Sequence, residues 1–206
     1  RTFRDSDGLW EHYRIEDVAT PAAWARDPEL VLHFYDLRRE QVLNAEPNAA
    51  HLVIAALEDS FPVQVVTQNI DDLHERAGSC QLIHMHGELM RARCLDCGRS
   101  SAWAGDLGIT SSCPGCARHG RLRPDIVWFG EMPYRMDEIG AALERCDLFV
   151  AIGTSGQVYP ASGFVATVRA AGSARTIEVN LQDSAMSSAF AERRLGTAGL
   201  LVPELV

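Results

Sequence analysis

Short apolar segments alternate with amphipathic helical patterns along most of the chain. The strongest helical signal begins at Asp27-Pro28, where an N-cap residue is followed by proline at the first helical position. Apolar side chains then recur at helical spacing, at Leu30, Val31, Phe34, Leu37 and Val42. The pattern predicts a helix from about residue 28 to residue 45.

The same alternation predicts further elements. Helices are expected at 47–57, 135–145 and 161–171, and strands at 63–67, 81–85, 125–128, 148–152 and 176–179. Strands that alternate with helices are typical of a parallel sheet covered by helices. We therefore expect an α/β fold, interrupted at residues 88–122 by a segment with several glycines and few large apolar residues.

That segment contains two Cys-x-x-Cys pairs, Cys94/Cys97 and Cys113/Cys116. Each two-residue spacer folds as a tight knuckle that points both sulfurs at the same place. Four thiolates from two such knuckles close a tetrahedral shell around one Zn²⁺. We expect this metal, rather than an apolar core, to organise residues 88–122.

Two other interpretations of these cysteines are weaker than zinc. Disulfides are favoured in small secreted domains with little core, but this chain has 206 residues, 47% hydrophobic content and no start that resembles a signal peptide. A thioredoxin-like redox motif would explain one Cys-x-x-Cys pair but not two. Cys80 and Cys146 lie outside the pattern, and such cysteines are more often small buried hydrophobes.

Composition and charge argue against several kinds of partner. The formal net charge is -9, whereas a protein that binds the nucleic-acid backbone needs a basic surface. No run of about 18 apolar residues occurs, so no segment is predicted to span a membrane. We expect a cytoplasmic, monomeric protein without nucleic-acid or membrane partners.

Polar residues follow three of the predicted strands. They form the run Thr67-Gln68-Asn69-Ile70-Asp71, the turn Gly153-Thr154-Ser155-Gly156, and Asn180. Ligands of parallel α/β sheets bind at the carboxyl ends of strands, and a turn rich in Gly, Ser and Thr can present N–H groups to a phosphate. One such loop usually does no more than cap a helix. Three on one sheet favour a nucleotide site.

His86 follows an apolar strand pattern and precedes Gly87, which places the imidazole at a strand tip. A histidine there can titrate near neutral pH and act as a general base. It can equally be a structural histidine that is hydrogen-bonded to a loop carbonyl. The residues alone leave these two interpretations even.

The order of these features resembles the motif series of sirtuins, the NAD-dependent protein-lysine deacylases. Seven elements occur in the family's order: Thr67-Gln68-Asn69-Ile70-Asp71, His86-Gly87, the paired Cys-x-x-Cys, Val127-Trp128-Phe129-Gly130-Glu131, Gly153-Thr154-Ser155, Val158-Tyr159-Pro160-Ala161 and Val179-Asn180. The resemblance covers nearly the whole chain. It implies a Rossmann-like parallel sheet with helices on both faces that binds NAD, a small zinc-ribbon domain, and a cleft between them for an acyl-lysine protein or peptide.

The resemblance also implies domain boundaries. Residues 1–45 would form the cofactor loop and a helical segment of the small domain, residues 88–122 the zinc-ribbon insert, and residues 46–87 and 123–206 the NAD-binding domain. The chain opens at Arg1-Thr2-Phe3-Arg4, which resembles the segment after the family's first Gly-rich loop. We therefore expect the first strand and that loop to be missing from this sequence.

Site roles come from the resemblance residue by residue. His86 would be the catalytic base, and the four cysteines would hold structural zinc. The residues expected to bind NAD are Phe3, Arg4, Gln68, Asn69, Asp71, Gly153, Thr154, Ser155, Asn180 and Ala198. The residues expected to bind substrate outside the acyl group are Val127, Phe129, Gly130, Glu131, Val158 and Tyr159. The first four of these would pair with the substrate backbone as an added strand does. The implied products are nicotinamide and O-acyl-ADP-ribose.

Tyr35 and Arg38 are three residues apart on the first predicted helix and therefore share a face. A phenol and a guanidinium together can hydrogen-bond a carboxylate. On an arbitrary helix, however, such a pair is usually exposed on the surface and binds no ligand. Within a sirtuin-like chain, Tyr-x-x-Arg resembles the acyl-pocket pair of the class III members, and Ala19 matches the small residue that widens their pocket. The resemblance thus predicts removal of succinyl, malonyl or glutaryl groups, with weaker deacetylation.

Two other functions would use parts of the same motif set. A zinc-ribbon docking module would need the cysteines but not His86, Asn69 or Asp71. A catalytically impaired NAD- or ADP-ribose-binding protein, or an ADP-ribosyl-transferring relative, would keep the NAD site without needing Tyr35 and Arg38.

Overall fold

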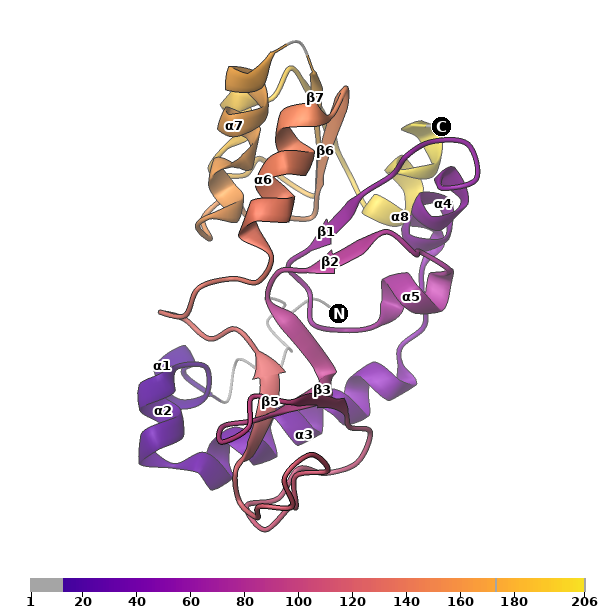
Figure 1. Cartoon of the computed structure of the whole chain (residues 1–206). Coiled ribbons are helices and arrows are strands. Elements are labelled where there is room, and N and C mark those ends of the chain that lie inside the picture. The colour runs from indigo at the N-terminus through magenta and orange to yellow at the C-terminus, as the bar shows by residue number, and fades with distance from the viewer. Residues whose placement is uncertain (1–12, 173, 206) are drawn as a thin grey trace. The chain divides into compact units, whose positions relative to one another are not determined.

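The computed structural model describes residues 13–172 and 174–205, which form two compact units (Figure 1). Unit one comprises the described residues up to 46, together with 67–72 and 84–134. Unit two comprises 47–66, 73–83 and the described residues from 135 onward. Phe3 and Arg4, which were expected to bind the cofactor, lie outside the described residues.

Unit one packs helices against a three-stranded antiparallel sheet. Its helices are α1 (Ile15–Val18), α2 (Pro21–Arg26) and α3 (Pro28–Asn44). The strands are β3 (Gly87–Cys94), β4 (Ser100–Ala102) and β5 (Leu122–Ile126), in the order β4-β3-β5. Helix α3 crosses β3 and β5 and contacts both (Figure 1).

Helix α3 begins where the sequence predicts. The Asp27 carboxylate accepts the N–H of Leu30 at 3.0 Å, and Pro28 opens the helix without losing a hydrogen bond. Its buried apolar face packs with strand residues into the main core of unit one. That core includes Val31, Phe34 and Tyr35 of α3, Leu89 of β3, Ile126 of β5, and Trp128. The predicted helix at 28–45 is confirmed to within one residue.

The strand predicted at 125–128 corresponds to β5, which lies at 122–126, and its expected place in a parallel sheet is wrong. Strand β5 ends at Ile126 and pairs antiparallel with β3, with Gly87 opposite Ile126 and Cys94 opposite Leu122. All five residues of β5 are buried, and continuous burial is also typical of a central parallel strand. The apolar pattern therefore indicates a strand there without specifying which strand it pairs with.

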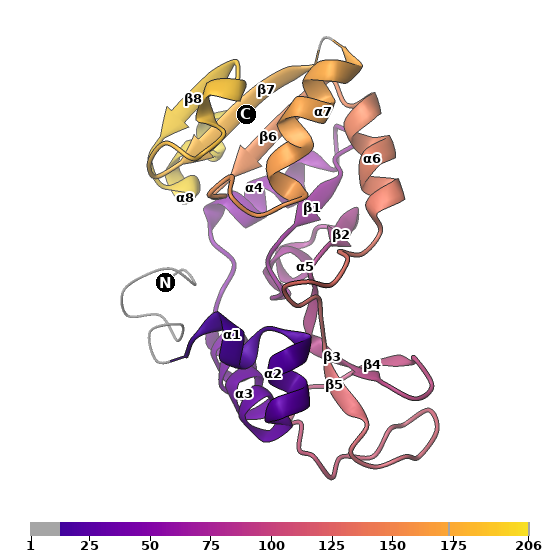
Figure 2. The same cartoon turned by 90° about the vertical axis from the view of Figure 1, so that its left-hand side faces the viewer.

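Unit two contains a parallel sheet of order β6-β7-β8 (Figure 2). Strands β6 (Leu148–Ile152) and β7 (Arg175–Asn180) confirm the predictions at 148–152 and 176–179. Strand β8 (Glu192–Leu195) was not predicted. Its sequence, Glu-Arg-Arg-Leu, has no apolar run and alternates between half-buried and exposed positions, so its strand character comes from pairing with β7.

Unit two also contains two pairs of helices that contact each other. Helices α6 (Met136–Arg145) and α7 (Phe164–Ala171) lie side by side (Figure 2). Helices α4 (Ala49–Leu57) and α8 (Ala198–Leu201) contact each other, and both contribute to the core around Ile177 and Val179 of β7. Three short 3₁₀ turns complete this part, at Ala161–Gly163, Ser187–Ala189 and Pro203–Leu205.

A third sheet, of two strands, is formed by β1 (Val65–Thr67) and β2 (Leu82–His84), with α5 (Leu73–Ala77) between them in sequence. The Glu58 carboxylate caps the turn before β2 by accepting the N–H of Cys80 at 3.0 Å. Among the helices of the described ranges, none combines the length and apolar content needed to cross a bilayer.

A buried arginine connects α3 to the segment that carries the cysteines. Arg39 is 2% exposed, and it donates to the carbonyls of Leu89 and Gly105, each at 3.2 Å. It also pairs with the Asp36 carboxylate, which accepts the N–H of Leu107 at 3.0 Å. Leu107 is fully buried. These bonds fix residues 105–107 against the helix.

Replacing Arg39 by methionine should lower the free energy of unfolding by about 3–5 kcal/mol, because the half-buried Asp36 carboxylate and two carbonyls lose their buried partner. The control is Arg26→Met, which removes an exposed ion pair with Asp17 and should cost about 0–1 kcal/mol. Urea denaturation measures both variants. Equal losses for the two would contradict the anchoring role of Arg39.

Candidate functional site

The structure brings the four predicted zinc ligands together in unit one. Their sulfurs all lie within 4.8 Å of one another, and none is in a disulfide. The Sγ atoms of Cys94 and Cys116 are 3.7 Å apart, and those of Cys97 and Cys113 are 3.8 Å apart. A tetrahedral shell with Zn–S distances of about 2.3 Å requires sulfur separations of about 3.8 Å. The donor set therefore fits a structural Zn²⁺.

Each cysteine knuckle is closed by its own backbone. Gly98 N–H donates to the Cys94 carbonyl at 3.0 Å, and Ala117 N–H donates to the Cys113 carbonyl at 2.8 Å. Gly98 and Ala117 both adopt left-handed backbone angles, with φ of 72° and 57°. Burial alone would raise the pKa of Cys113, but neighbouring N–H groups, including that of Gly115 at 3.3 Å, favour the thiolate and lower the pKa to about 7.

Replacing Cys97 by serine should abolish stoichiometric zinc binding, because a hydroxyl is a poor substitute for a thiolate ligand. Native mass spectrometry should then show chains without zinc, and the melting temperature should fall, since metal binding contributes directly to folding. The matched control is Cys80→Ser, which changes an exposed free thiol outside the cluster. Full zinc occupancy in the Cys97 variant would refute the assignment.

His86 is oriented by a backbone carbonyl. Its Nδ1 lies 3.0 Å from the carbonyl oxygen of Gln68. A carbonyl can only accept, so Nδ1 carries the proton and Nε2 keeps a free lone pair. Burial lowers the pKa of His86, and the hydrogen bond to Gln68 opposes this with a smaller effect. The imidazole is therefore neutral near pH 7 and can accept a proton at Nε2.

The polar run after β1 is held by a local turn. Asn69 N–H donates to the Thr67 hydroxyl at 3.0 Å, and Thr67 itself is buried. Gln68 and Asp71 are half-buried, whereas Asn69 is exposed. Three residues expected to bind NAD therefore share the loop whose Gln68 carbonyl orients His86.

In unit two, hydrogen bonds join the loops that follow β6 and β7. Asn180 donates from Nδ2 to the Thr154 carbonyl at 2.6 Å, and its Oδ1 accepts the N–H of Leu181 at 3.0 Å. Gly153 has a positive φ of 64° and open space where a Cβ would stand, so a ligand can approach its backbone closely. Asn180 thus holds the loop that contains Gly153, Thr154 and Ser155 at the end of β6. Ala198 opens α8, just beyond β8.

The three residues expected to recognise the acyl group lie inside unit one. Ala19, Tyr35 and Arg38 are each 4% exposed, and the first two belong to the same apolar core. The Arg38 guanidinium lies 4.2 Å from the centre of the Phe34 ring. Burial raises the pKa of Tyr35 to about 12 and lowers the pKa of Arg38 to about 10. At neutral pH the phenol therefore keeps its proton and the guanidinium keeps its charge.

The segment expected to pair with substrate uses its N–H groups within the protein. Val127 N–H donates to the His86 carbonyl at 2.9 Å, and Phe129 N–H donates to the Ala19 carbonyl at 3.0 Å. The carbonyls of Val127 and Phe129 accept no hydrogen bond from any described residue. Gly130 has a positive φ of 92°. Any added strand would therefore pair mainly with carbonyl groups here.

One residue close to this segment, Arg123, was missed by the sequence reasoning. Arg123 is 3% exposed and places its guanidinium 3.3 Å from the centre of the Trp128 ring. Both terminal nitrogens of Arg123 donate to the Glu131 carboxylate, at 2.7 and 2.9 Å. The available signal was an arginine between Leu122 and Pro124, next to a predicted buried strand, because a buried charge needs a partner. Glu131 thus has an internal partner in addition to its expected substrate role.

The remaining substrate candidates, Val158 and Tyr159, precede the 3₁₀ turn at Ala161–Gly163 in unit two, and the Tyr159 side chain is 77% exposed.

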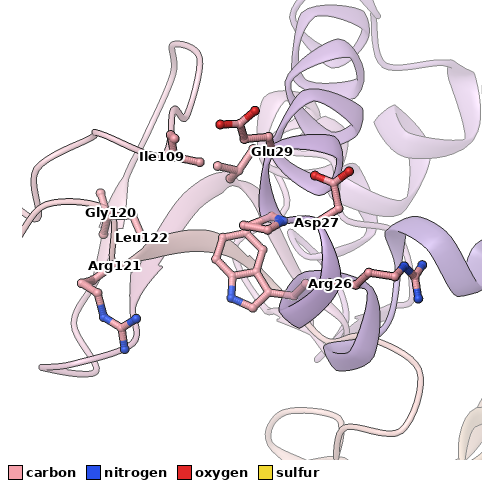
Figure 3. A pocket seen from close by; sticks show the side chains of 10 residues that line it. Arg26, Asp27, Glu29, Ile109, Gly120, Arg121 and Leu122 are labelled. Carbon is pink, nitrogen blue, oxygen red and sulfur yellow. The ribbon is translucent and has the colours of Figure 1, made fainter.

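A hollow of about 370 Å³ in unit one lies apart from these residues (Figure 3). Trp24, Leu32 and Leu122 supply apolar lining, and Glu29 and Ile109 approach it from the start of α3 and from the cysteine-bearing segment. None of the predicted site residues that the structure describes lines it. It is therefore not the predicted site.

Comparisons with known proteins agree with the resemblance. The model of the Sir2 family matches residues 1–160. A Bdellovibrio bacteriovorus relative named NAD-dependent protein deacylase is 53% identical over all of this chain and 88% of its own length. A Shewanella oneidensis relative of the same name is 56% identical over all of this chain and 86% of its own length.

A solved structure gives the same result for the fold. The crystal structure of a Sir2 homolog–NAD complex is 40% identical to this chain, with a TM-score of 0.90 over 100% of this chain and 81% of that one. The chain therefore belongs to the Sir2 family. The sirtuin resemblance and the Rossmann-like α/β fold with a four-cysteine cluster are confirmed.

Proposed function

We propose that this Sir2-family chain is an NAD-dependent protein-lysine deacylase that prefers succinyl, malonyl and glutaryl groups and has weaker deacetylase activity. Its products would be nicotinamide and O-acyl-ADP-ribose. The observation that supports the acyl preference most directly is the burial of Arg38 beside Tyr35, in the core that also contains Ala19.

A buried guanidinium favours an anionic ligand for a simple physical reason. Taking Arg38 out of water costs free energy, which is why burial lowers its pKa. An acyl carboxylate placed against it would regain that cost through paired, charge-assisted hydrogen bonds. Tyr35 would add one neutral donor. An acetyl group lacks the carboxylate and would gain neither contact.

The NAD-binding role is proposed for two sets of polar residues, one in each unit. Gln68, Asn69 and Asp71 would hold the nicotinamide and its ribose, Thr154 and Ser155 would contact the adenosine half, and Asn180 would bind the adenine-side ribose. When bound, NAD supplies a ribose carbon from which nicotinamide can leave. Positioning that carbon against the acyl oxygen would account for much of the rate.

His86 would accept a proton from a ribose hydroxyl through Nε2, because Nδ1 is committed to the Gln68 carbonyl. The acyl-lysine peptide would lie along residues 127–131, paired with the carbonyls of Val127 and Phe129. The four proposed zinc ligands form no disulfide, which is compatible with the reducing cytoplasm, where we expect the protein to act as a monomer.

Replacing Arg38 by methionine should reduce kcat/KM for a succinyl-lysine peptide about 10- to 100-fold, the effect of losing hydrogen bonds to a charged group. Turnover of the acetyl-lysine peptide of the same sequence should fall far less. Nicotinamide release, measured with each peptide and with none, gives both values. Equal losses on the two peptides would refute the acyl preference. Release by wild type when an unacylated protein replaces the acyl peptide would indicate ADP-ribosyl transfer to that protein instead.

The acid limb of the pH profile of kcat/KM should lie below 6.5, the ordinary pKa of histidine, because burial lowers the pKa of His86. Activity is present above the lowered pKa and is lost as falling pH protonates Nε2. An NMR titration of the imidazole in the free protein checks the same pKa. His86→Gln should remove this limb and slow turnover about 10²- to 10⁴-fold. A limb above 6.5 that follows His86 would contradict the assignment.

A further inference from the structure

A buried series of contacts leads from Glu131 to the Tyr35 hydroxyl. The Glu131 carboxylate accepts two hydrogen bonds from Arg123 and also accepts the backbone N–H of Trp128 at 2.8 Å. The Arg123 guanidinium covers the face of the Trp128 indole. The indole Nε1 then donates to the Tyr35 Oη at 3.0 Å. Trp128 and Tyr35 are 2% and 4% exposed.

The last bond in this series determines what Tyr35 can do. An indole N–H is only a donor, so the Tyr35 oxygen must be the acceptor. The hydroxyl proton of Tyr35 cannot point back at Trp128, and it remains available to donate to another group. The Arg123 guanidinium stacks on the face of the indole, and the Glu131 carboxylate accepts the backbone N–H of Trp128. These two contacts fix the direction of the Nε1–H bond.

We propose that Trp128 is a positioning residue for acyl-group specificity: its indole N–H holds the Tyr35 hydroxyl as a hydrogen-bond donor toward an acyl carboxylate bound at Arg38. This inference rests on the proposed function. Trp128 acts through Tyr35 and touches no reacting atom. It therefore belongs to the recognition of acidic acyl groups rather than to the chemical step.

A purely structural role for Trp128 makes a different prediction. The indole also packs against Trp24, with ring centres 5.8 Å apart, and belongs to the main core of unit one. Loss of packing alone would weaken turnover of every acyl substrate to a similar extent. Loss of the Nε1–H bond would weaken only substrates whose carboxylate needs the Tyr35 donor.

The test is a double-mutant cycle of Trp128→Phe and Tyr35→Phe, with kcat and KM measured on succinyl-lysine and acetyl-lysine peptides of one sequence. Trp128→Phe should lower the succinyl-to-acetyl ratio of kcat/KM about 3- to 10-fold, the effect of one neutral hydrogen bond. The change should appear in KM for the succinyl peptide rather than in kcat. In the Tyr35→Phe background the same substitution should leave the ratio within about two-fold, because coupled residues are non-additive.

The matched control is Trp103→Phe, which removes an indole bond to the Asp106 carbonyl in the same unit. It should leave the ratio of the two substrates unchanged. A wild-type protein without preference for the succinyl peptide would remove the proposed function and this inference together. A wild-type preference that survives Trp128→Phe, or losses that add in the double variant, would overturn the inference alone.

A second measurement needs no change at Trp128. The indole N–H resonance of Trp128 in ¹⁵N-labelled protein should shift when the succinyl peptide binds, and shift much less with the acetyl peptide. In Tyr35→Phe that difference should disappear. Spectra of variants at Trp10, Trp24 and Trp103, the other three tryptophans of the chain, identify the resonance by elimination. The same shift with both peptides would refute the positioning role.

Discussion

Packing of α3 against β3 and β5 is the constraint on which unit one depends. Because side chains three and four residues apart share a helix face, α3 can present Val31 and Phe34 to the core while Arg39 reaches the cysteine-bearing segment. Tyr35 and Arg38 are buried by the same packing. The candidate acyl site therefore stands on a rigid helix, which holds functional groups more accurately than a loop does.

Local signals in the sequence were sufficient for some features. The start of α3 was predictable because Asp27 and Pro28 adjoin the helix that they begin. The zinc ligands were predictable because each knuckle is a local structure. In contrast, the bond between Trp128 and Tyr35 joins residues 93 positions apart, and no periodicity reports such a contact. For the same reason the apolar pattern indicated β5 but assigned it to the wrong sheet.

Backbone carbonyls near strand ends orient the polar side chains of both units. The Gln68 carbonyl accepts a hydrogen bond from Nδ1 of His86, and the Thr154 carbonyl accepts one from the Asn180 amide. This explains why two interpretations of His86 were even at the sequence level. An imidazole has two nitrogens, so one can be structural while the other remains free for chemistry. The hydrogen bond that is typical of a structural histidine also fixes the tautomer that a general base needs.

Net charge limits how an acidic acyl group could be selected. The chain carries a formal charge of -9, so its overall field repels a carboxylate at long range. That field is screened beyond about 8–10 Å in physiological salt, whereas buried groups are screened much less. Arg38, at 4% exposure, acts only at short range, where desolvation strengthens its attraction. Preference for acidic groups in this protein would therefore come from contacts made after binding, and not from electrostatic steering of the encounter.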